Sequence, residues 1–557
     1  MAPAGRRRAA TLLCALVLII GACDDDEGEP AAGASSSPPP VDEIEGAPSP
    51  TTGPIFEPGD DVLRVAVTEP TTLDPMRIGD PGSVLVARQL YESLTGWNAI
   101  DEEVFPAAAE SWEVLDGGRR FRFHLRPGTT FHDGSPVTAE DFVFAFDRIA
   151  QKENGSALAY TLERVQGFDA VNHLGDSDHL TGLKAIDELT LQIHLAEPNA
   201  DLPALLTHPG LVPLPQSSVK ELETFLRQPA GNGPFEMARP WDPGQPIVMR
   251  RFAGFVRTPP LDGIRFTPFP DAASSWLDFV AGDFDVAEVP ADQIEAAAEV
   301  YGEEGYQPLL AGYYFGFNLE SSSVGDKTLR KAINLAIDRN FIAETIYRST
   351  MDPPRGIVPV GMPGFQFNVC AELCEYRPDD AERLVSRMRR GKRHVTLEYT
   401  RGEPHRRVAR AVGANLEAVG LRVKIRSFPF NEYLKRLRNG DQQMYRLGWI
   451  GEYPVPEAFL STLFGSQSPD NHSGFSSSKV DRLLRQARAE PSPGKRQQLF
   501  VKAEQMIMKQ VPIAPIGTFI THWAAQAHVE GMRFDVMGAF DAFDVSLSEE
   551  ASPEDAG

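Results

Sequence analysis

Some serines in this chain stand at the distance from a lysine that a catalytic serine and its lysine have in certain enzymes. Ser217 stands three residues before Lys220, and Ser476 stands three residues before Lys479. In enzymes that transfer acyl groups through such a pair, the serine hydroxyl attacks the substrate, and KTG and SDN motifs complete the site. The sequence contains neither of these motifs. We therefore interpret both pairs as coincidences in serine-containing loops.

Other catalytic signatures are absent from the sequence as well. It contains no phosphate-binding loop, no HExxH, no GxSxG and no glycine-rich dinucleotide motif. His132 precedes Asp133, but Gly134, Ser135 and Pro136 follow, and this composition is typical of a turn. We therefore expect a protein that is not an enzyme and that needs neither a metal nor a cofactor.

The segment around Trp449 has the residue types of a binding site. Trp449 stands three residues before Glu452, and Tyr453 follows directly. A carboxylate in a water-poor cleft forms a strong ion pair with a desolvated ammonium group, and a flat indole offers apolar area to a side chain. Trp449 and Glu452 are therefore candidate ligand contacts. The alternative is that Glu452 is a solvated loop acid and Trp449 is a core residue.

Alternating apolar residues predict the elements of the first half of the chain. Residues 112–114 and 121–125 have the pattern of two strands in a hairpin, joined through an Asp-Gly-Gly turn at residues 116–118. Residues 138–141 have the pattern of a capping box. The helix that this box opens carries its apolar residues on one face, namely Phe142, Ala145, Phe146 and Ile149.

In the second half of the chain, predicted helices alternate with predicted strands. Residues 329–348 place apolar side chains along one side of a helix. Residues 395–399 and 421–425 are predicted strands, and residues 408–419 between them are a predicted helix. This alternation favours a region with a mainly parallel sheet.

The N-terminus has the features of an export signal. Three arginines precede the apolar residues 12–20, a run that is too short to span a bilayer as a mature helix. The sequence before Cys23 is similar to a bacterial lipobox, so we expect residues 1–22 to be a signal peptide and Cys23 to be lipidated. Residues 23–59 are rich in Ala, Ser, Pro and acid, which predicts a disordered tether. An ordinary signal peptide or a short anchor is the alternative.

Composition restricts the remaining possibilities. The net charge is −24, which argues against nucleic acid as a partner, and a hydrophobic share of 42% fits a globular α/β protein. Of the four cysteines, Cys14 and Cys23 belong to the N-terminal segment. In an oxidising compartment, we expect Cys370 and Cys374 to form a local disulfide.

The order of hairpin, turn and capped helix in residues 105–149 resembles the bacterial extracellular solute-binding proteins of family 5, which serve peptide and nickel ABC importers. Residues 91–94, 231–235 and 241–245 carry further motifs that are similar to those of the family. The resemblance implies an α/β fold of the periplasmic-binding-protein type II class. Two lobes with a hinge would make up this fold, with an extra subdomain in the first lobe.

The same resemblance implies the domain boundaries. The expected parts are lobe I (residues 60–316 and 513–545) with an accessory subdomain at about 105–228, lobe II (residues 317–512), and a disordered tail (residues 546–557). Because the chain crosses between the lobes twice, we expect hinges near residues 314–320 and 510–517.

For function, the resemblance implies a lipid-anchored substrate-binding protein of an ABC importer, exported to the cell membrane and acting as a monomer. It would capture a peptide or a similar small solute by closing its lobes and deliver it to the permease and ATPase subunits. In peptide-binding members, an Asp at the position of Glu452 pairs with the α-ammonium of the ligand, and the loop that contains Asp80 meets the ligand. Tyr314 at the hinge is a further candidate contact, together with Trp449 and Tyr453.

Two kinds of alternative remain within this resemblance. The ligand could be a nickel chelate, haem, an oligosaccharide or a cell-wall peptide instead of an ordinary peptide. The chain could also be a signalling or adhesion lipoprotein that has the fold without the transport function.

Overall fold

The computed structural model describes residues 55–57, 59–98, 101, 103–451 and 453–548. The predicted signal peptide, the lipidation site at Cys23 and the candidate ligand contact Glu452 lie outside the described residues.

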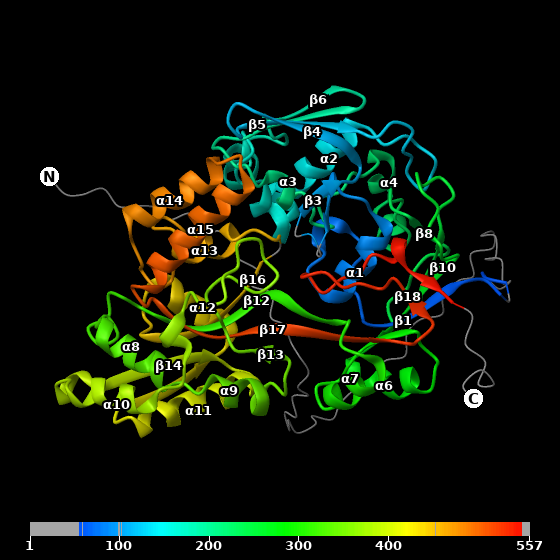
Figure 1. Cartoon of the computed structure of the whole chain (residues 1–557). Coiled ribbons are helices and arrows are strands. Elements are labelled where there is room, and N and C mark those ends of the chain that lie inside the picture. The colour runs from blue at the N-terminus through cyan, green and yellow to red at the C-terminus, as the bar shows by residue number, and fades with distance from the viewer. Residues whose placement is uncertain (1–54, 58, 99–100, 102, 452, 549–557) are drawn as a thin grey trace, which may run out of the picture.

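One large mixed sheet runs through the molecule (Figure 1). Its order is β15 (Arg422–Phe428), β14 (His394–Thr400), β16 (Met444–Ile450), β12 (Tyr306–Phe317), β17 (Ile513–Ala525), β11 (Val286–Glu288), β1 (Val62–Thr68), β10 (Gly263–Phe269), β9 (Ile247–Arg251) and β8 (Phe235–Met237), with β13 (Met351–Asp352) beside β17. β14 pairs in parallel with β15 and β16, and β1 pairs in parallel with β10 and β11. The parallel strands predicted for the second half of the chain are therefore present.

The two long central strands connect the two halves of this sheet. β12 and β17 pair in an antiparallel fashion from Tyr306–His522 to Gly316–Ile513. At one end β17 also pairs with β11 of lobe I, and at the other end β12 pairs with β16 of lobe II. In Figure 1, β17 extends from beneath lobe I to lobe II. These strands are the two crossings between the lobes, as a type II fold requires.

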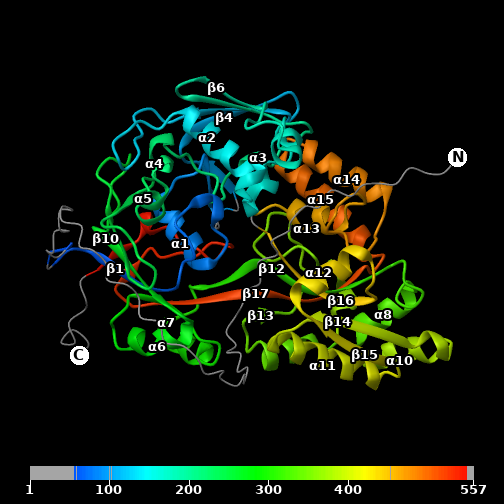
Figure 2. The ribbon, with the colours of Figure 1, turned by 180° about the vertical axis from the view of Figure 1, so that it is seen from behind.

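Helices cover lobe II on both faces of its sheet. They are α8 (Lys327–Ala336), α10 (Pro378–Ser386), α11 (Glu403–Ala418) and α12 (Phe430–Asn439), and seen from behind α10 and α11 lie at the outer end of the lobe (Figure 2). Leu329, Ile333, Leu397 and Val412 are fully buried in the core that α8, α10 and α11 share with the sheet. Before α10, Cys370 and Cys374 are joined by a disulfide.

The helix predicted over residues 329–348 is shorter than expected. α8 ends at Ala336 because Ile337 has an extended backbone, with φ −82° and ψ 121°. Asp338 then caps a new short helix, α9 (Arg339–Phe341), by accepting a hydrogen bond from the Phe341 amide. The apolar period continues across this break, and for that reason the sequence pattern did not reveal it.

The accessory subdomain has the hairpin and the capped helix predicted from its sequence. β4 (Ala109–Leu115) and β5 (Arg120–Leu125) join β7 (Thr190–His194) and β6 (Leu183–Asp187) in a separate sheet. The turn places Asp116 at φ 49° and Gly117 at φ 62°, the left-handed conformation that Asp and Gly tolerate. Thr138 and Asp141 form the capping box of α2 (Ala139–Ala150).

His132 has a structural role in this region. Its ring accepts a hydrogen bond from the Gly231 amide at 3.1 Å and contacts the Gly233 carbonyl at 3.1 Å. Burial lowers its pKa to about 4. The neutral imidazole, with its two hydrogen-bond contacts, connects the turn after β5 to the loop before β8. This agrees with the interpretation of His132 as a turn residue.

Candidate ligand-binding site

A cavity of about 2180 Å³ lies between the lobes. Its wall is formed in lobe I by residues 78–81, 155–161 and 163–165, in the crossing strand β12 by residues 309–312, and in lobe II by residues 399–406 and 446–451. The lobe II segments follow or end the parallel strands β14 and β16. The cavity therefore opens at the carboxyl ends of these strands, where ligands of open α/β sheets bind.

Asp80 lies on the lobe I wall, at the start of α1 (Pro81–Leu90). Its carboxylate caps this helix by accepting hydrogen bonds from the Ser83 amide at 2.8 Å and from the Thr71 hydroxyl at 2.5 Å. Pro81 occupies the first turn, where its missing N–H costs nothing. The carboxylate of Asp80 thus fixes the shape of the rim loop, while the loop itself faces the cavity.

Trp449 lies on the opposite wall. It is the next-to-last residue of β16, opposite Gly312 of β12, and its half-buried indole lines the cavity. The indole Nε1 is buried and has no hydrogen-bond partner among the described residues. Tyr453 also lines the cavity, and its side chain is mostly buried. The two aromatic candidates are therefore brought to one wall.

Tyr314 occupies a different place. Its backbone pairs with Leu447 and Pro515 in the hinge, and its side chain is 6% exposed in the core. The residues of β12 that line the cavity are 309–312, and Tyr314 is not one of them. Burial, the largest cause, raises the pKa of its hydroxyl well above the usual value. The structure thus places Tyr314 as a packing residue of the hinge.

A polar cluster that the sequence did not indicate lies around Tyr313. The guanidinium carbon of Arg446 lies 4.5 Å from the centre of the Tyr313 ring, and the rings of Tyr347 and His405 lie 6.0 and 5.9 Å from it. Arg446, Tyr347 and His405 line the cavity. These residues come from four distant parts of the chain. The pairing of β12 with β16 brings Arg446 to Tyr313, and Tyr347 and His405 reach the same ring from outside these strands.

The charges in this cluster are unbalanced. Within the described part of the chain, Arg446 has no carboxylate partner, and its buried Nε and the Nδ1 of His405 have no hydrogen-bond partner. Burial, reinforced by the charge of Arg446, lowers the pKa of His405 to about 3, so the imidazole is neutral. A fixed cation beside a neutral imidazole and a phenol hydroxyl provides donors for an anionic ligand group such as a carboxylate.

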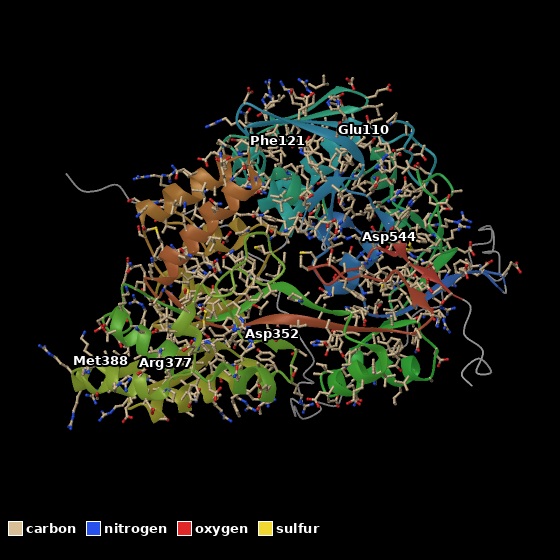
Figure 3. All side chains as sticks on the ribbon, viewed as in Figure 1. Glu110, Phe121, Asp352, Arg377, Met388 and Asp544 are labelled. Atoms are coloured by element: carbon tan, nitrogen blue, oxygen red, sulfur yellow. A yellow bond between two sulfur atoms is a disulfide. The ribbon has the colours of Figure 1, made fainter. Side chains whose placement is uncertain are left out.

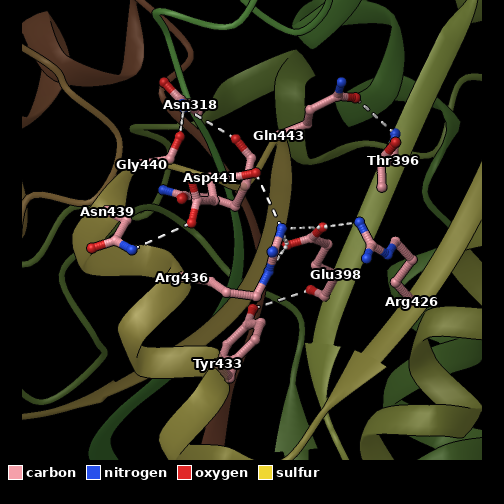
Figure 4. A network of polar contacts seen from close by, with 11 residues as sticks. Asn318, Thr396, Glu398, Arg426, Tyr433, Arg436, Asn439, Gly440, Asp441 and Gln443 are labelled. Atoms are coloured by element: carbon pink, nitrogen blue, oxygen red, sulfur yellow. Dashed lines mark hydrogen bonds and ion pairs between the residues drawn. The ribbon is translucent and has the colours of Figure 1, made fainter.

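A network of polar contacts around Glu398 and Tyr433 (Figure 4) also holds the strand that carries Arg446. The hydroxyl of Tyr433 lies 2.6 Å from the carbonyl of Arg446 and 3.1 Å from that of Glu398. The buried carboxylate of Glu398 pairs with Arg436 at 2.9 Å and with Arg426 at 3.5 Å. α12, β14 and β16 are thereby fixed to one another, and the position of the Arg446 backbone is determined before a ligand arrives.

On the far side of the cavity, ion pairs join the accessory subdomain to the helices α13 (Glu457–Phe464), α14 (Ser478–Ala489) and α15 (Pro493–Met508). The buried carboxylate of Glu457 lies 2.8 Å from Arg164 and 2.9 Å from Arg488. A second pair joins Asp201 to Arg496 at 2.6 Å. Both views show these helices beside the accessory subdomain (Figures 1 and 2).

Among the residues that the structure describes, no group of three or more His, Cys, Asp or Glu side chains could hold a metal ion. Within the same residues, no helix is both long enough and apolar enough to cross a membrane.

Comparison with protein families and curated proteins gives consistent matches. The family model described as "Bacterial extracellular solute-binding proteins, family 5 Middle" matches residues 103–471. The "Probable deoxycholate-binding periplasmic protein YgiS" of Escherichia coli (strain K12) is 29% identical over 464 residues, which cover 81% of this chain and 86% of that protein. The "Oligopeptide-binding protein OppA" of Bacillus subtilis (strain 168) is 26% identical over 491 residues, which cover 84% of this chain and 88% of that protein.

Comparison with solved structures shows the same fold. The murein tripeptide binding protein MppA, in its unliganded open form, matches with a TM-score of 0.77 at 24% identity, covering 88% of this chain and 99% of that one. HbpA2 from Haemophilus parasuis matches with a TM-score of 0.76 at 22% identity, and the match covers 88% of this chain and 100% of that one. The fold is therefore that of the type II periplasmic binding proteins, with two lobes, a hinge and an extra subdomain.

Proposed function

Because the chain belongs to the bacterial extracellular solute-binding proteins of family 5, we propose that it captures a peptide or a similar small solute between its lobes for an ABC importer. Relatives such as OppA of Bacillus subtilis are peptide-binding proteins. The ligand would be presented to a membrane permease, and ATP would be used by other subunits. The chain itself performs no chemical step.

The observation that carries this proposal is Arg446 in the wall of the cavity, which has no carboxylate partner within the described part of the chain. The α-carboxylate of a peptide matches the donors of Arg446, Tyr347 and His405. Glu452 is the proposed partner of the α-ammonium, because its neighbours Gly451 and Tyr453 both line the cavity. A peptide with two free ends thus finds a cation and an acid, and Trp449 offers apolar area between them.

Closure of the lobes follows from the crossing strands. β12 and β17 permit rotation of one lobe against the other while they keep the lobes in register. A ligand that contacts both walls favours the closed state, because only there does it make all of its contacts.

We also propose that the protein is exported and anchored by a lipid on Cys23. The apolar run before Cys23 and the small residues beside it support this proposal. The disulfide between Cys370 and Cys374 supports a location outside the cytoplasm, where such bonds persist. A tether of the length of residues 24–59 reaches on the order of 30 Å. The lobes would thus remain close to the membrane.

A second candidate ligand is an amphipathic anion. The relative YgiS is described as a probable deoxycholate-binding protein. In the present chain, Arg446 faces a cavity that also contains apolar side chains, among them Leu310, Ile450 and Phe519. A carboxylate on a rigid apolar body would contact the same cation and need no amine partner.

Thermal-shift measurements with matched peptide pools test the proposal. Pools of random short peptides are compared in three forms: both ends free, N-acetylated, and C-amidated. We expect the free-ended pool to raise the melting temperature most. Arg446→Gln should remove the preference for a free carboxylate, and Glu452→Gln should remove the preference for a free amine. Arg482→Gln, an exposed change on α14, is the control that should behave as the wild type.

Three results would contradict the proposal that a peptide binds between the lobes in this orientation. Stabilisation by deoxycholate without any effect of peptides would favour the second candidate. Stabilisation by sugars or metal chelates alone would exclude both candidates. An unchanged preference for free carboxylates in Arg446→Gln would exclude the assigned orientation.

A further inference from the structure

Positive charge is concentrated in one part of lobe II. Residues 383–438 contain 16 Arg and Lys against 4 Asp and Glu, a net charge of +12, whereas the whole chain carries −24. Some of these side chains, such as Arg401 and Arg406, line the cavity between the lobes. The others require a separate explanation.

Seven of the basic residues outside the cavity lie at or before the amino ends of β14 and β15. His394 of β14 pairs with Arg422 of β15, and Thr396 pairs with Lys424. Lys392, in the turn before β14, donates a hydrogen bond to the Ser322 carbonyl at 2.7 Å. Figure 3 shows nitrogen-tipped side chains projecting into solvent around Met388, at the end of the lobe. We call this region the distal basic surface; its residues are Arg387, Arg389, Arg390, Lys392, Arg393, Arg422 and Lys424.

The charges of the distal basic surface are not balanced by nearby acids. In the described part of the chain, no carboxylate forms an ion pair with any of the seven residues, and the neighbouring ion pairs involve Arg383 and Arg426 instead. Except for the half-buried Arg393, all seven are exposed. Repulsion among unpaired like charges disfavours such a cluster unless an anionic partner offsets it.

This region also contains a hollow of about 390 Å³. α11 covers the face of β15 that carries Val423 and Ile425. On the other face, α12 reaches only as far as Glu398, through Arg436 (Figure 4). Beyond that point lies the hollow, which is lined by Lys392, His394, Thr396, Arg422, Lys424, Ser322, Ser323 and Gln443 together with their neighbours.

The hollow is separate from the ligand cavity. The cavity reaches Thr400 at the carboxyl end of β14, while the hollow reaches His394 at its amino end. Six residues of strand separate these points, a distance of about 20 Å. A ligand bound between the lobes therefore does not occupy the distal basic surface.

Protection of the sheet edge accounts for only part of the pattern. β15 is the edge strand of the sheet, and exposed Arg and Lys on an edge discourage pairing with other chains. This explains Arg422 and Lys424. It does not explain Arg387, Arg389 and Arg390, which precede β14 and lie outside the edge strand.

We propose that the distal basic surface binds the anionic phosphate headgroups of a membrane surface. Clusters of four to eight basic residues bind anionic lipids with about 1 kcal/mol for each Lys or Arg near the surface. The hollow with its hydroxyl and cationic lining accommodates a headgroup phosphate, and the surrounding arginines contact its neighbours. The contact orients lobe II towards the bilayer and leaves the cavity free. It does not depend on the identity of the ligand.

Vesicle flotation tests this proposal with residues 24–557, which contain every element of the described part of the chain. Vesicles that contain phosphatidylglycerol are compared with vesicles of phosphatidylcholine alone, at low and at physiological salt. The test variant is Lys392→Gln/Arg422→Gln/Lys424→Gln. The matched control is Arg482→Gln/Lys495→Gln/Lys502→Gln, which removes three exposed charges on α14 and α15. A second test variant, Arg387→Gln/Arg389→Gln/Arg390→Gln, changes only residues outside the sheet.

We expect binding to the anionic vesicles alone, weakening with salt, and a loss of at least about tenfold in both test variants but not in the control. The proposal is overturned if no binding occurs, if the control loses as much as the test variants, or if phosphatidylcholine vesicles bind equally well. It is also overturned if millimolar inorganic phosphate abolishes vesicle binding at constant ionic strength, because the hollow would then hold a small soluble anion. Binding of an acidic protein without any binding of vesicles would assign the surface to a protein partner instead.

Discussion

Replacing Glu457 by Gln should weaken the connection between the accessory subdomain and lobe II. The Glu457 side chain is 3% exposed, and its carboxylate lies between Arg164 of the subdomain at 2.8 Å and Arg488 of α14 at 2.9 Å. Glutamine has nearly the same shape but no charge. Two guanidinium groups would then face each other without their shared carboxylate.

The loss of folding free energy in Glu457→Gln can be worked out from the burial of the Glu457 carboxylate. Breaking a buried ion pair by removing one partner costs about 3–5 kcal/mol. Arg164 keeps Glu163 at 3.6 Å, and Arg488 keeps Glu197 at 3.5 Å, but these carboxylates are 55% and 63% exposed. Exposed pairs contribute about 0–1 kcal/mol, so they do not replace Glu457. We therefore expect a loss of about 3 kcal/mol.

Urea denaturation followed by tryptophan fluorescence measures this loss. The control is Asp242→Asn, which removes an ion pair of short distance, 2.6 Å to Arg227, in which both partners are more than half exposed. The control should change the free energy of unfolding by less than about 1 kcal/mol. A change of less than about 0.5 kcal/mol for Glu457→Gln, the size of an ordinary surface substitution, would refute the reasoning.

Three further changes have expected outcomes. Burial raises the pKa of Glu504 to about 7. The pKa of Glu504 is higher in the folded than in the unfolded state, so its full contribution to stability is present below about pH 4.3. As the pH rises from there to about 7, about 3 kcal/mol of the free energy of unfolding is lost. Glu504→Gln should remove this part of the pH dependence in denaturation curves recorded from pH 4 to 8, and an unchanged dependence would contradict the assignment. Tyr433→Phe deletes the hydroxyl that lies 2.6 Å from the Arg446 carbonyl, so it should cost about 1–2 kcal/mol of stability and weaken ligand binding, measured by denaturation and by calorimetry. Equal stability of this variant and the wild type would show that the bond is dispensable. Cys370→Ser/Cys374→Ser opens a short loop and should cost about 2 kcal/mol, whereas reducing agent should then have no further effect on the melting temperature.

The sequence specified those parts of the fold in which the signal is local. The turn at Asp116 and Gly117 and the capping box of Thr138 and Asp141 each depend on residues within four positions of one another, and both are present. The end of α8 was missed although its signal is also local. Ile337 continues the apolar period, and only the capping residue Asp338 marks the break.

The candidate site could be predicted only in part, because strand pairing decides it. Trp449 was found through a motif, and the structure places it on the cavity wall. Arg446 and His405 have no motif of their own, and they meet only because β12 and β16 pair. Tyr313 and Tyr314 are adjacent in the sequence, but successive residues of a strand point to opposite faces. Tyr313 therefore lies beneath Arg446, whereas Tyr314 packs on the other side.

The central claim is that a peptide with a free carboxylate occupies the cavity between the lobes. Native mass spectrometry tests it directly, after incubation of the protein with an equimolar pool of random peptides and with deoxycholate. We expect complexes whose added masses are those of peptides with free ends, and we expect these complexes to be lost in Arg446→Gln. Complexes with deoxycholate alone, or peptide complexes that persist unchanged in Arg446→Gln, would contradict it.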